Sequence, residues 1–419
     1  MNARHVPPLP AGWHVLRPPH VPASKSELNR LLVLAALLPG ETRVGPRAAS
    51  PADDVARLVA SLQALGAPVR EQDDGWVIGA LDLEDPTPRA VEAGEGGTTS
   101  RFLVALASRR AGPTEVRGGE QLGRRPIEPL LVALRALGAE AERLPGPGLR
   151  VRVRGPWTRP GPIEVEAGES SQFASALLLC APPAGLSLRA GGDPVSRPYL
   201  ELTLRTLRAA GAGVEPLDGG WRVEGPRAPA GELRAAADAS SLTYPAALAA
   251  LRGEVLLPRP DPDQADGRFP ALLAAMGARV EPVPGELLRI AAAPLRGIEL
   301  DARDCPDLVP ALCAVASAAR GETRVTGAAH LRAKESDRIA LLAGLLRAFG
   351  VGAEERADGL VVGGTGDLAG HSPDARPPVG GDHRLAMTGA VLGRAGRGAW
   401  IETPGCVGKS WPGFWEWLL

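Results

Sequence analysis

The chain has 419 residues with 47 basic and 48 acidic side chains, and its formal net charge at pH 7 is −1. Domains hold roughly 100–200 residues, so this length predicts two of them. The balanced charge gives no reason to expect nucleic acid or an anionic membrane as a partner. No apolar run approaches the roughly 20 residues of a membrane helix, and the N-terminus lacks the apolar core of a secretory signal. The four cysteines are scattered without metal-binding spacing, which favours free thiols in a cytoplasmic protein.

Lysine is rare in this chain. Only Lys25, Lys334 and Lys409 are lysines, which leaves 44 arginines among the 47 basic residues. We interpret this as a drift of the composition toward arginine. An arginine stays charged, whereas a lysine ammonium can lose its proton when its surroundings favour the neutral form. The three lysines are therefore predicted to mark positions where arginine would not serve.

Taken in chain order, the sequence repeats a pair of elements about every 70 residues. The first element is an apolar helix followed by a glycine or a short β-type run. Its six copies lie at residues 28–38, 101–111, 172–180, 244–251, 308–319 and 384–393. The 52 glycines and 42 prolines approach the level of disordered chains, but this periodic placing of apolar residues predicts a folded protein.

The second element is a helix that ends at a glycine and leads into a strand, a turn and another strand. Its copies lie at residues 58–65, 130–137, 202–210, 272–276 and 341–349. The glycine after each copy stands where a helix C-cap needs a left-handed residue. The strands alternate apolar and polar residues, as in Leu149–Arg154, so one face is expected to be exposed. A sixth copy would begin at Trp411, where the chain ends.

Each repeat unit therefore predicts the order β-α-β-α-β-β. One unit buries too little surface to be stable alone, whereas three make a domain of about 200 residues. We expect an α/β (α+β) fold with two three-unit domains, one of residues 23–236 and one of residues 1–22 plus 237–419. The predicted hinges lie near residues 20–24 and 235–240. A strand at Trp13–Leu16 has no clear partner in the first half and is expected to pair with the second domain.

Polar residues gather at the starts of the first-type helices. Ser24-Lys25-Ser26, Gly97-Thr98-Thr99 and Ser170-Ser171-Gln172 are three such groups. Any one of them would be an ordinary helix cap. However, a lysine is unfavourable at the positive end of a helix dipole unless an anion is present, and helix N-termini hold phosphate and carboxylate groups well. All three lysines fall in clusters of this kind, so the pattern predicts a site for small anionic ligands.

Several other kinds of site are not supported by the sequence. Gly405–Ser410 looks like the end of a nucleotide-binding P-loop, but Thr403 stands where the first glycine is required and only nine residues follow. Zinc-protease, nucleophile-elbow and dinucleotide motifs are also missing from the sequence. A lone His383 is more often a capping or core residue than a metal ligand, so we expect no metal.

Nine short motifs occur in order between Pro22 and Phe414. They are Ser24–Arg30, Gly97-Thr98 with Arg101, Arg125–Ile127, Ser170–Phe173, Asp238–Ser241, Pro306-Asp307, Lys334–Arg338, Asp382–Arg384 and Lys409. Together they resemble the family of 5-enolpyruvylshikimate-3-phosphate synthases, which are enolpyruvyl transferases. The resemblance implies two domains, each with three β-α-β-α-β-β units around a pseudo-threefold axis, and an active site in the cleft between the domains.

The resemblance also implies a reaction. The enolpyruvyl group of phosphoenolpyruvate is transferred to the 5-hydroxyl of shikimate 3-phosphate by addition and elimination, and phosphate is released, in the sixth step of the shikimate pathway to chorismate and aromatic amino acids. It implies a cytoplasmic monomer without metal or organic cofactor, without nucleic-acid or membrane partners, and a target of glyphosate. The two substrates carry about six negative charges, which arginine forks, lysines and helix N-termini would bind.

The family's functional residues map onto this sequence by motif. The residues implied to bind shikimate 3-phosphate are Lys25, Ser26, Arg30, Ser170, Ser171, Gln172, Ser196, Asp307, His330 and Lys334. Those implied to bind phosphoenolpyruvate are Lys25, Gly97, Arg125, Gln172, Arg338, Arg384 and Lys409. Three are implied to be catalytic: Asp307 orients or deprotonates the 5-hydroxyl, Glu335 protonates the methylene carbon, and Lys25 shuttles a proton. Which group is the acid and which the base stays open.

The sequence departs from the family pattern in two places. Glu95-Gly96 stand where the family usually has Asn-Ala, and a carboxylate there would weaken phosphoenolpyruvate binding unless it is turned away or paired. His330 stands where asparagine is common. Two alternatives stay open: UDP-N-acetylglucosamine enolpyruvyl transferase, whose loop cysteine is missing from residues 112–126, and a non-catalytic anion-binding protein that kept the fold.

Overall fold

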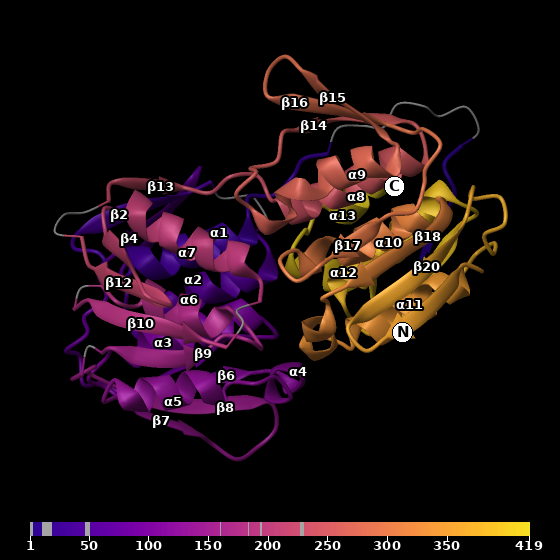
Figure 1. The fold of residues 1–419 in the computed structure, drawn as a ribbon. Helices are drawn as coiled ribbons and strands as arrows, with labels where there is room; N and C mark the ends of the chain where they lie inside the picture. The colour runs from indigo at the N-terminus through magenta and orange to yellow at the C-terminus, as the bar shows by residue number, and fades with distance from the viewer. Residues whose placement is uncertain are drawn as a thin grey trace. The chain divides into compact units, whose positions relative to one another are not determined.

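The computed structural model describes residues 3–10, 19–46, 51–159, 161–182, 184–192, 195–226 and 230–419. The chain divides into two compact units. We call Ala23–Ala236 the inserted unit, and Met1–Pro22 together with Ala237–Leu419 the terminal unit. In Figure 1 the inserted unit runs from indigo to magenta. The strand expected at Trp13–Leu16 lies outside the described residues.

The inserted unit holds three four-stranded sheets that share one strand order. In each sheet the first two strands are parallel and the other pairs are antiparallel. The first sheet is β13 (Glu232–Arg234), β2 (Glu41–Gly45), β4 (Gly75–Gly79) and β3 (Val69–Gln72). The second is β5 (Arg89–Glu92), β6 (Thr114–Gly118), β8 (Leu149–Arg154) and β7 (Glu140–Arg143). The third is β9 (Ile163–Glu166), β10 (Leu186–Gly191), β12 (Gly220–Glu224) and β11 (Gly213–Leu217).

The first of these sheets is completed from the far end of the unit. Its parallel strand β13 pairs Leu233 with Val44 of β2, although the two residues are far apart in sequence. The corresponding parallel strands of the other two sheets, β5 and β9, come just before their own helices in the chain. The sequence repeat did not predict that β13 pairs with β2, because the residue pattern of a short strand does not show which strand it pairs with.

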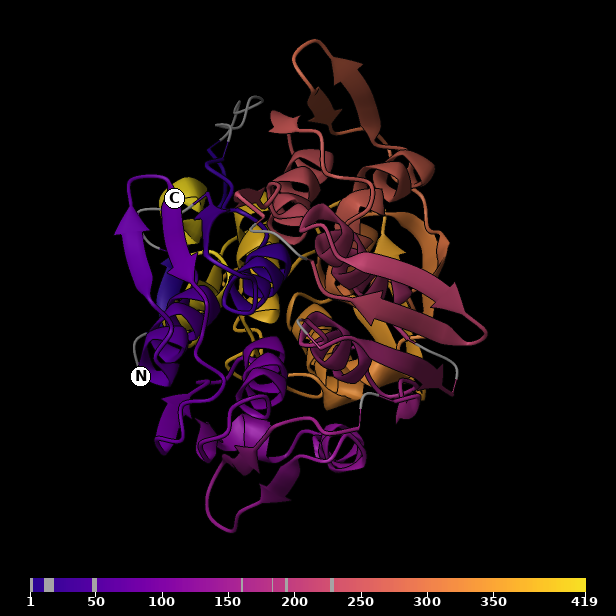
Figure 2. The ribbon, with the colours of Figure 1, turned by 90° about the vertical axis from the view of Figure 1, so that its left-hand side faces the viewer.

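The helices of the inserted unit form two sets. The first-type helices are α1 (Lys25–Ala35), α3 (Gly97–Ala107) and α6 (Gln172–Leu179), and the second-type helices are α2 (Asp53–Leu65), α5 (Glu128–Ala136) and α7 (Arg197–Ala209), with a short α4 (Glu120–Gly123) before α5. α1, α3 and α6 contact one another and are buried over most of their length, because they are apolar on nearly every side. In Figure 2, where the inserted unit faces the viewer, its strands lie around the outside of these helices.

The terminal unit repeats the same plan less completely. One four-stranded sheet has the same order, with β17 (Glu299–Asp301), β18 (Arg320–Thr326), β20 (Gly359–Thr365) and β19 (Gly352–Arg356). Within the described residues the other two sheets are smaller: β14 (Glu254–Pro258), β16 (Leu287–Ala291) and β15 (Arg279–Val283) in one, and β1 (Arg4–Val6) with β21 (Ala399–Ile401) in the other. The chain's beginning is therefore tied to its end, since Arg4 pairs with Ile401.

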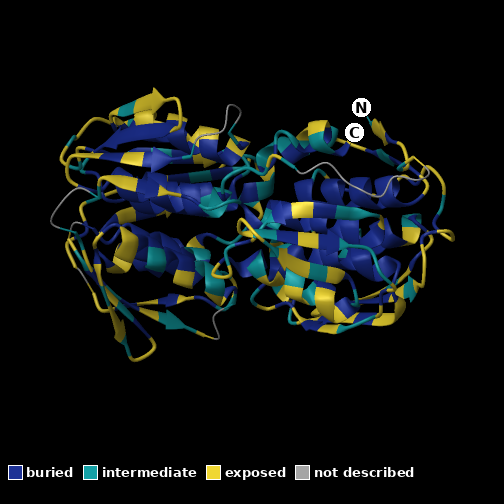
Figure 3. Cartoon of the chain, turned by 90° about the horizontal axis from the view of Figure 1, so that it is seen from above, coloured by how far each residue is buried: buried dark blue, intermediate teal, exposed yellow. Residues whose placement is uncertain are grey.

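The first-type helices of the terminal unit are α8 (Ala239–Leu251), α10 (Val309–Ser317) and α12 (His383–Ala395), which contact one another in a second core. The second-type helices are α9 (Phe269–Met276), α11 (Arg338–Ala348) and α13 (Phe414–Leu418). Short 3-10 turns lie at η1 (Ala265–Arg268), η2 (Pro306–Leu308), η3 (Ala329–Ala333) and η4 (Pro404–Lys409). Figure 3 shows the buried residues concentrated in the helices and the exposed ones in turns and outer strands.

Two local predictions are confirmed. The glycine after each predicted second-type helix has a left-handed φ, for example +100° at Gly66 and +108° at Gly277, where another residue would be strained. The polar groups also stand at true helix starts, since α1 begins at Lys25, α3 at Gly97 and α6 at Gln172. Among the described residues, no helix has both the length and the apolar character needed to cross a bilayer.

Candidate functional site

The predicted site residues fall into two clusters, one in each unit. The inserted-unit cluster consists of Lys25, Ser26, Arg30, Gly97, Arg125, Ser170, Ser171, Gln172 and Ser196. The terminal-unit cluster consists of Asp307, His330, Lys334, Glu335, Arg338, Arg384 and Lys409. Apart from Arg30, which lies in the second turn of α1 (Lys25–Ala35), these residues stand at the starts of helices or in the segments that precede them.

Lys25 is the first residue of α1 and has a carboxylate beside it. Ser24 caps the helix by accepting a hydrogen bond from the Glu27 amide. The Lys25 Nζ atom lies 2.9 Å from Oδ2 of Asp54, and the two side chains are 16% and 4% exposed. The Asp54 carboxylate therefore neutralises the ammonium charge of Lys25, which is otherwise unfavourable at a helix N-terminus. Asp54 was not predicted from the sequence, because acidic residues in the first turn of a helix are common.

Arg30 is held inside the inserted unit. Its Nε donates to Thr203 Oγ1 at 2.8 Å, Nη1 to the Ser26 carbonyl at 2.7 Å and Nη2 to the Tyr199 carbonyl at 2.9 Å. Burial lowers the pKa of Arg30 to about 10, which still leaves the guanidinium charged at neutral pH. Arg30 thus joins α1 to α7, in addition to the substrate contact that its motif implies.

Gly97 lies directly under a guanidinium. A Cβ at this position would collide with the guanidinium of Arg125, so only glycine lets Arg125 lie across the start of α3. Arg101 fixes this arrangement by donating to the Gly97 carbonyl at 3.1 Å and to the Pro126 carbonyl at 2.6 Å. The start of α3 therefore presents a cation next to its first amide groups, which suits an anionic ligand.

The other polar groups of the inserted-unit cluster link neighbouring helix starts. Ser170 Oγ accepts from the Gln172 amide at 3.2 Å, and Gln172 Nε2 donates to Thr98 Oγ1 at 3.2 Å. The Gln172 Oε1 atom is buried and has no hydrogen-bond partner among the described residues. Ser196, which is also buried, precedes α7 in a left-handed conformation. A buried acceptor and a buried hydroxyl are thus available at the starts of α6 and α7.

Glu95, the first departure from the family pattern, is paired inside the unit. Its Oε2 accepts from the Leu122 amide of α4 at 3.3 Å. The side chain covers Gly119, where a Cβ would collide with it. One carboxylate oxygen is therefore held by α4, which meets the condition under which this residue is compatible with phosphoenolpyruvate binding.

In the terminal-unit cluster, two carboxylates and two guanidinium groups alternate. Nε of Arg338 donates to Oδ2 of Asp382 at 3.0 Å, and its Nη1 donates to Oδ1 of Asp307 at 3.0 Å. Arg384 Nη2 donates to the second oxygen of Asp307 at 2.9 Å. The anions raise the pKa of Arg338 against the opposing effect of burial. Asp307 therefore sets the spacing of the two guanidinium groups.

Asp382 anchors this network, and its side chain is fully buried. Besides Arg338, its carboxylate accepts from Ser336 Oγ at 3.1 Å and from the Arg384 amide at 2.9 Å, which caps α12. One carboxylate thus orients Arg338 and the helix that carries Arg384. The motif Asp382–Arg384 contributed to the resemblance, but the sequence alone did not show this anchoring role.

Glu335 lies between the ammonium of Lys409 and the imidazole of His383. Its Oε1 is 2.9 Å from Nζ of Lys409, and its Oε2 is 2.8 Å from Nδ1 of His383. Burial raises the pKa of Glu335, but the charges of His383 and Lys409 outweigh it and hold the pKa well below its usual range. Glu335 is therefore ionised in this arrangement, and an acid role requires a proton delivered by a neighbour or by bound substrate.

Glu335, Asp382 and His383 offer three possible metal-ligand atoms within 4.8 Å of one another. However, Lys409 contacts Glu335 at 2.9 Å and Arg338 contacts Asp382 at 3.0 Å. The protein's own cations thus neutralise both carboxylates, and this donor set fits an ion-pair network better than a divalent metal.

His330, the second departure from the family pattern, carries a neutral ring at physiological pH. Burial, assisted by the charge of Lys334, lowers its pKa to about 4. A neutral imidazole can donate from one nitrogen and accept at the other, as the amide of the commoner asparagine can with its two groups. Hydrogen bonding at this position is therefore preserved without an added charge.

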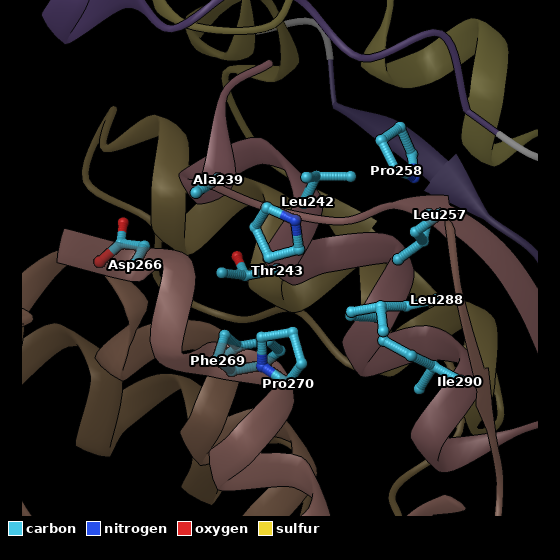
Figure 4. Close-up of a pocket in the computed structure, with 12 residues that line it drawn as sticks. Ala239, Leu242, Thr243, Leu257, Pro258, Asp266, Phe269, Pro270, Leu288 and Ile290 are labelled. Atoms are coloured by element: carbon cyan, nitrogen blue, oxygen red, sulfur yellow. The ribbon is translucent and has the colours of Figure 1, made fainter. Parts of the chain in front are cut away.

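Asp266 in η1 was not predicted from the sequence. Its carboxylate is buried and accepts from Ser240 Oγ at the start of α8. Burial, assisted by the charge of Asp307, raises the pKa of Asp266 to about 7. Asp266 also lines a small hollow with Thr243 and mainly apolar side chains (Figure 4). That apolar lining does not suit the phosphorylated ligands predicted for the polar clusters.

The raised pKa of Asp266 makes stability depend on pH. The folded state holds a proton on Asp266 that the unfolded chain releases near pH 4, so this contribution is complete below pH 4 and is lost as pH rises through about 7. We expect the free energy of unfolding to fall less between pH 5 and pH 8 in Asp266→Asn than in the parent. Urea titrations at both pH values measure the difference, and equal falls in the two proteins would contradict the prediction.

Comparisons with known proteins agree with the geometry. The profile of the family described as EPSP synthase (3-phosphoshikimate 1-carboxyvinyltransferase) matches residues 20–418. The 3-phosphoshikimate 1-carboxyvinyltransferase of Methanocorpusculum labreanum is 35% identical over 94% of this chain and 93% of its own length. The enzyme of that name from Thermococcus kodakarensis is 36% identical over 95% of both chains.

Solved structures show the same fold. The EPSP synthase of Acinetobacter baumannii superposes with a TM-score of 0.78 at 25% identity, covering 99% of this chain and 96% of that one. The enolpyruvyl transferase NikO of Streptomyces tendae superposes with a TM-score of 0.74 at 17% identity, over 99% and 96% of the two chains, which supports the fold alone. The expected α/β fold is thereby confirmed. The chain belongs to the EPSP synthase family.

Proposed function

We infer that the protein transfers the enolpyruvyl group of phosphoenolpyruvate to the 5-hydroxyl of shikimate 3-phosphate and releases phosphate. The observation that carries this inference is the Asp307 carboxylate with a guanidinium on each oxygen, at 3.0 Å from Arg338 and 2.9 Å from Arg384, in a chain of this family. Such a carboxylate is close to cations that can hold a substrate anion, and it can accept a hydroxyl proton. The reaction is a step on the route to chorismate and the aromatic amino acids.

The assignment of binding residues is part of the proposal. Shikimate 3-phosphate is bound by Lys25, Ser26, Arg30, Ser170, Ser171, Gln172, Ser196, Asp307, His330 and Lys334. Phosphoenolpyruvate is bound by Lys25, Gly97, Arg125, Gln172, Arg338, Arg384 and Lys409. The guanidinium next to the first amide groups of α3 and the pair of guanidinium groups on Asp307 support this division, because both arrangements match phosphate and carboxylate groups.

The proposed chemistry conserves atoms and protons. In the addition, the 5-hydroxyl oxygen bonds to C2 of phosphoenolpyruvate, its proton passes to the protein, and C3 gains a proton to become a methyl group. In the elimination, C3 returns a proton and the bond from C2 to the phosphate oxygen breaks. We assign the hydroxyl to Asp307 and the carbon to Glu335, with Lys25 as a proton shuttle. The contacts of Glu335 with His383 and Lys409 support its place here, since both partners can hold protons.

We further propose a cytoplasmic monomer that needs no metal or organic cofactor. The four cysteines Cys180, Cys305, Cys313 and Cys406 are free, as is usual in a reducing compartment. The ion pairs between Glu335, Lys409, Arg338 and Asp382 supply within one chain the positive charge that a metal would otherwise bring.

The test mixes the purified protein with shikimate 3-phosphate and phosphoenolpyruvate and measures phosphate release together with the enolpyruvyl product. We expect release that requires both substrates. UDP-N-acetylglucosamine in place of shikimate 3-phosphate is the control acceptor, and release with it instead would identify the other transferase activity. Binding of both substrates without release, in a mixture that a known synthase converts, would leave the non-catalytic alternative.

A further inference from the structure

The ion pair between Lys25 and Asp54 joins a predicted catalytic lysine to a residue outside the predicted site. The Lys25 Nζ atom is 2.9 Å from Oδ2 of Asp54, and both side chains belong to the inserted unit. A lysine is a point charge on a flexible stem of four methylene groups, and at the first position of a helix the dipole repels it. A fixed anion beside the ammonium therefore narrows the range of positions that it takes.

Stability alone does not explain an aspartate at position 54. Its side chain is 4% exposed, and its Oδ1 is buried without a hydrogen-bond partner in the part of the chain that the structure describes. A buried acceptor of this kind destabilises the folded state. The neighbouring Asp53 already supplies the favourable negative charge at the start of α2, in an exposed pair with Arg57 at 2.8 Å. A second, buried carboxylate at position 54 therefore calls for another explanation.

The packing around Asp54 places its carboxylate between two helix starts. A Cβ at Gly96 would lie 2.8 Å from Asp54 Oδ1 and 2.8 Å from Thr99 Oγ1. Thr99 Oγ1 in turn donates to the Asp54 carbonyl at 3.4 Å. Gly96 is the position where the family pattern usually has alanine, and here the missing methyl group leaves room for the carboxylate. Asp54 is thus fixed against the first turn of α3 while it holds the first residue of α1.

We propose that Asp54 is a positioning residue that holds the Lys25 ammonium at the start of α1 for the enolpyruvyl transfer. Asp54 acts through Lys25 and does not itself touch the substrates. This inference rests on the proposed function, because Lys25 is its predicted proton shuttle and anion ligand. It assigns a role to a residue that none of the nine family motifs contains.

The scarcity of lysine makes a direct measurement possible. With [ε-13C]lysine the protein gives three lysine resonances, one each from Lys25, Lys334 and Lys409. Single Lys→Arg variants assign them. We expect 13C relaxation to show an ordered Lys25 side chain in the parent. In Asp54→Asn the Lys25 resonance should become mobile while the other two stay unchanged. Gly96→Ala, which removes no charge, should have the same effect because its methyl group displaces the carboxylate.

Asp53→Asn is the matched control, since it removes an acid from the same helix turn but one paired with exposed Arg57. We expect it to leave all three resonances and kcat/KM within about twofold of the parent, because exposed pairs contribute little. Asp54→Asn should lower kcat/KM by about tenfold or more while the midpoint of thermal unfolding stays within a few degrees. In the Lys25→Met background, Asp54→Asn should change kcat/KM less than twofold, since the two residues act as one unit.

The outcomes separate the inference from the function on which it rests. A parent that releases no phosphate refutes the proposed function, whatever the resonances show. An active parent with an unchanged Lys25 resonance in Asp54→Asn overturns the positioning role. So does full turnover of that variant, or an equal loss with and without Lys25, which would identify Asp54 as a purely structural residue.

Discussion

Replacing Lys25 by arginine should lower kcat by about 10²- to 10⁴-fold, the usual worth of general acid–base catalysis, while the fold is retained. Arginine keeps the charge and can pair with Asp54 through its guanidinium, so the start of α1 stays neutralised. It cannot release a proton near neutral pH, and its planar fork is larger than the ammonium that the 16% exposed side chain carries. Steady-state phosphate release measures the loss, and circular dichroism with thermal unfolding verifies the fold.

The reverse exchange at a neighbouring pair is the control. Arg57→Lys alters the exposed partner of Asp53 on α2, and we expect turnover and stability to stay near those of the parent. Near-normal turnover of Lys25→Arg would refute the idea that this position needs a removable proton. The same result would also remove the reason for interpreting the three lysines as positions where arginine does not serve.

Removing the Asp382 side chain should have the largest effect on stability. We expect Asp382→Ala to lower the free energy of unfolding of the terminal unit by about 3–5 kcal/mol, because the buried Arg338 would lose one of its two anions and keep only Asp307, which it shares with Arg384. Arg338 is 2% exposed and bonds Asp382 at 3.0 Å, and Asp382 also caps α12. Urea unfolding followed by tryptophan fluorescence measures the change.

Asp337→Ala provides the comparison for that loss. Asp337 also caps a helix and pairs with an arginine, since it accepts from the Ala340 amide of α11 and lies 2.8 Å from Arg332, but its side chain is 43% exposed. We expect a loss of about 1 kcal/mol, typical of an N-cap. Equal losses of unfolding free energy in the two variants would contradict the prediction, because they would show that Asp382 stabilises the fold only as a helix cap.

Local patterns in the sequence predicted the elements well. The left-handed glycines, such as Gly66 and Gly277, and the helix starts at Lys25 and Gly97 are set by residues next to one another in the chain. Helix caps and φ preferences depend on residues within one turn of helix, so they can be predicted from a single sequence. The repeat then multiplied each local signal across the chain, which made the α/β fold predictable before any contact was known.

Contacts between distant residues were not predictable in the same way. β13 pairs with β2, and Asp54 pairs with Lys25 across 29 positions, yet neither strand nor acid differs from its neighbours in sequence. The raised pKa of Asp266 comes first from burial and then from the charges of Asp307 and Asp238, all of which depend on the fold. Ion pairs and burial depend on which surfaces of the chain come into contact. The repeat predicts the elements, but it does not predict the partner or the burial of a single side chain.

The paired strands β1 and β21 are synthesised far apart in time. Arg4–Val6 leave the ribosome long before their partners Ala399–Ile401. At 5–20 residues per second the interval is on the order of 20–80 s. By contrast, every strand of the inserted unit is available once Arg234 has been made. The inserted unit can therefore complete its sheets on the nascent chain, while β1 cannot pair until β21 has been made.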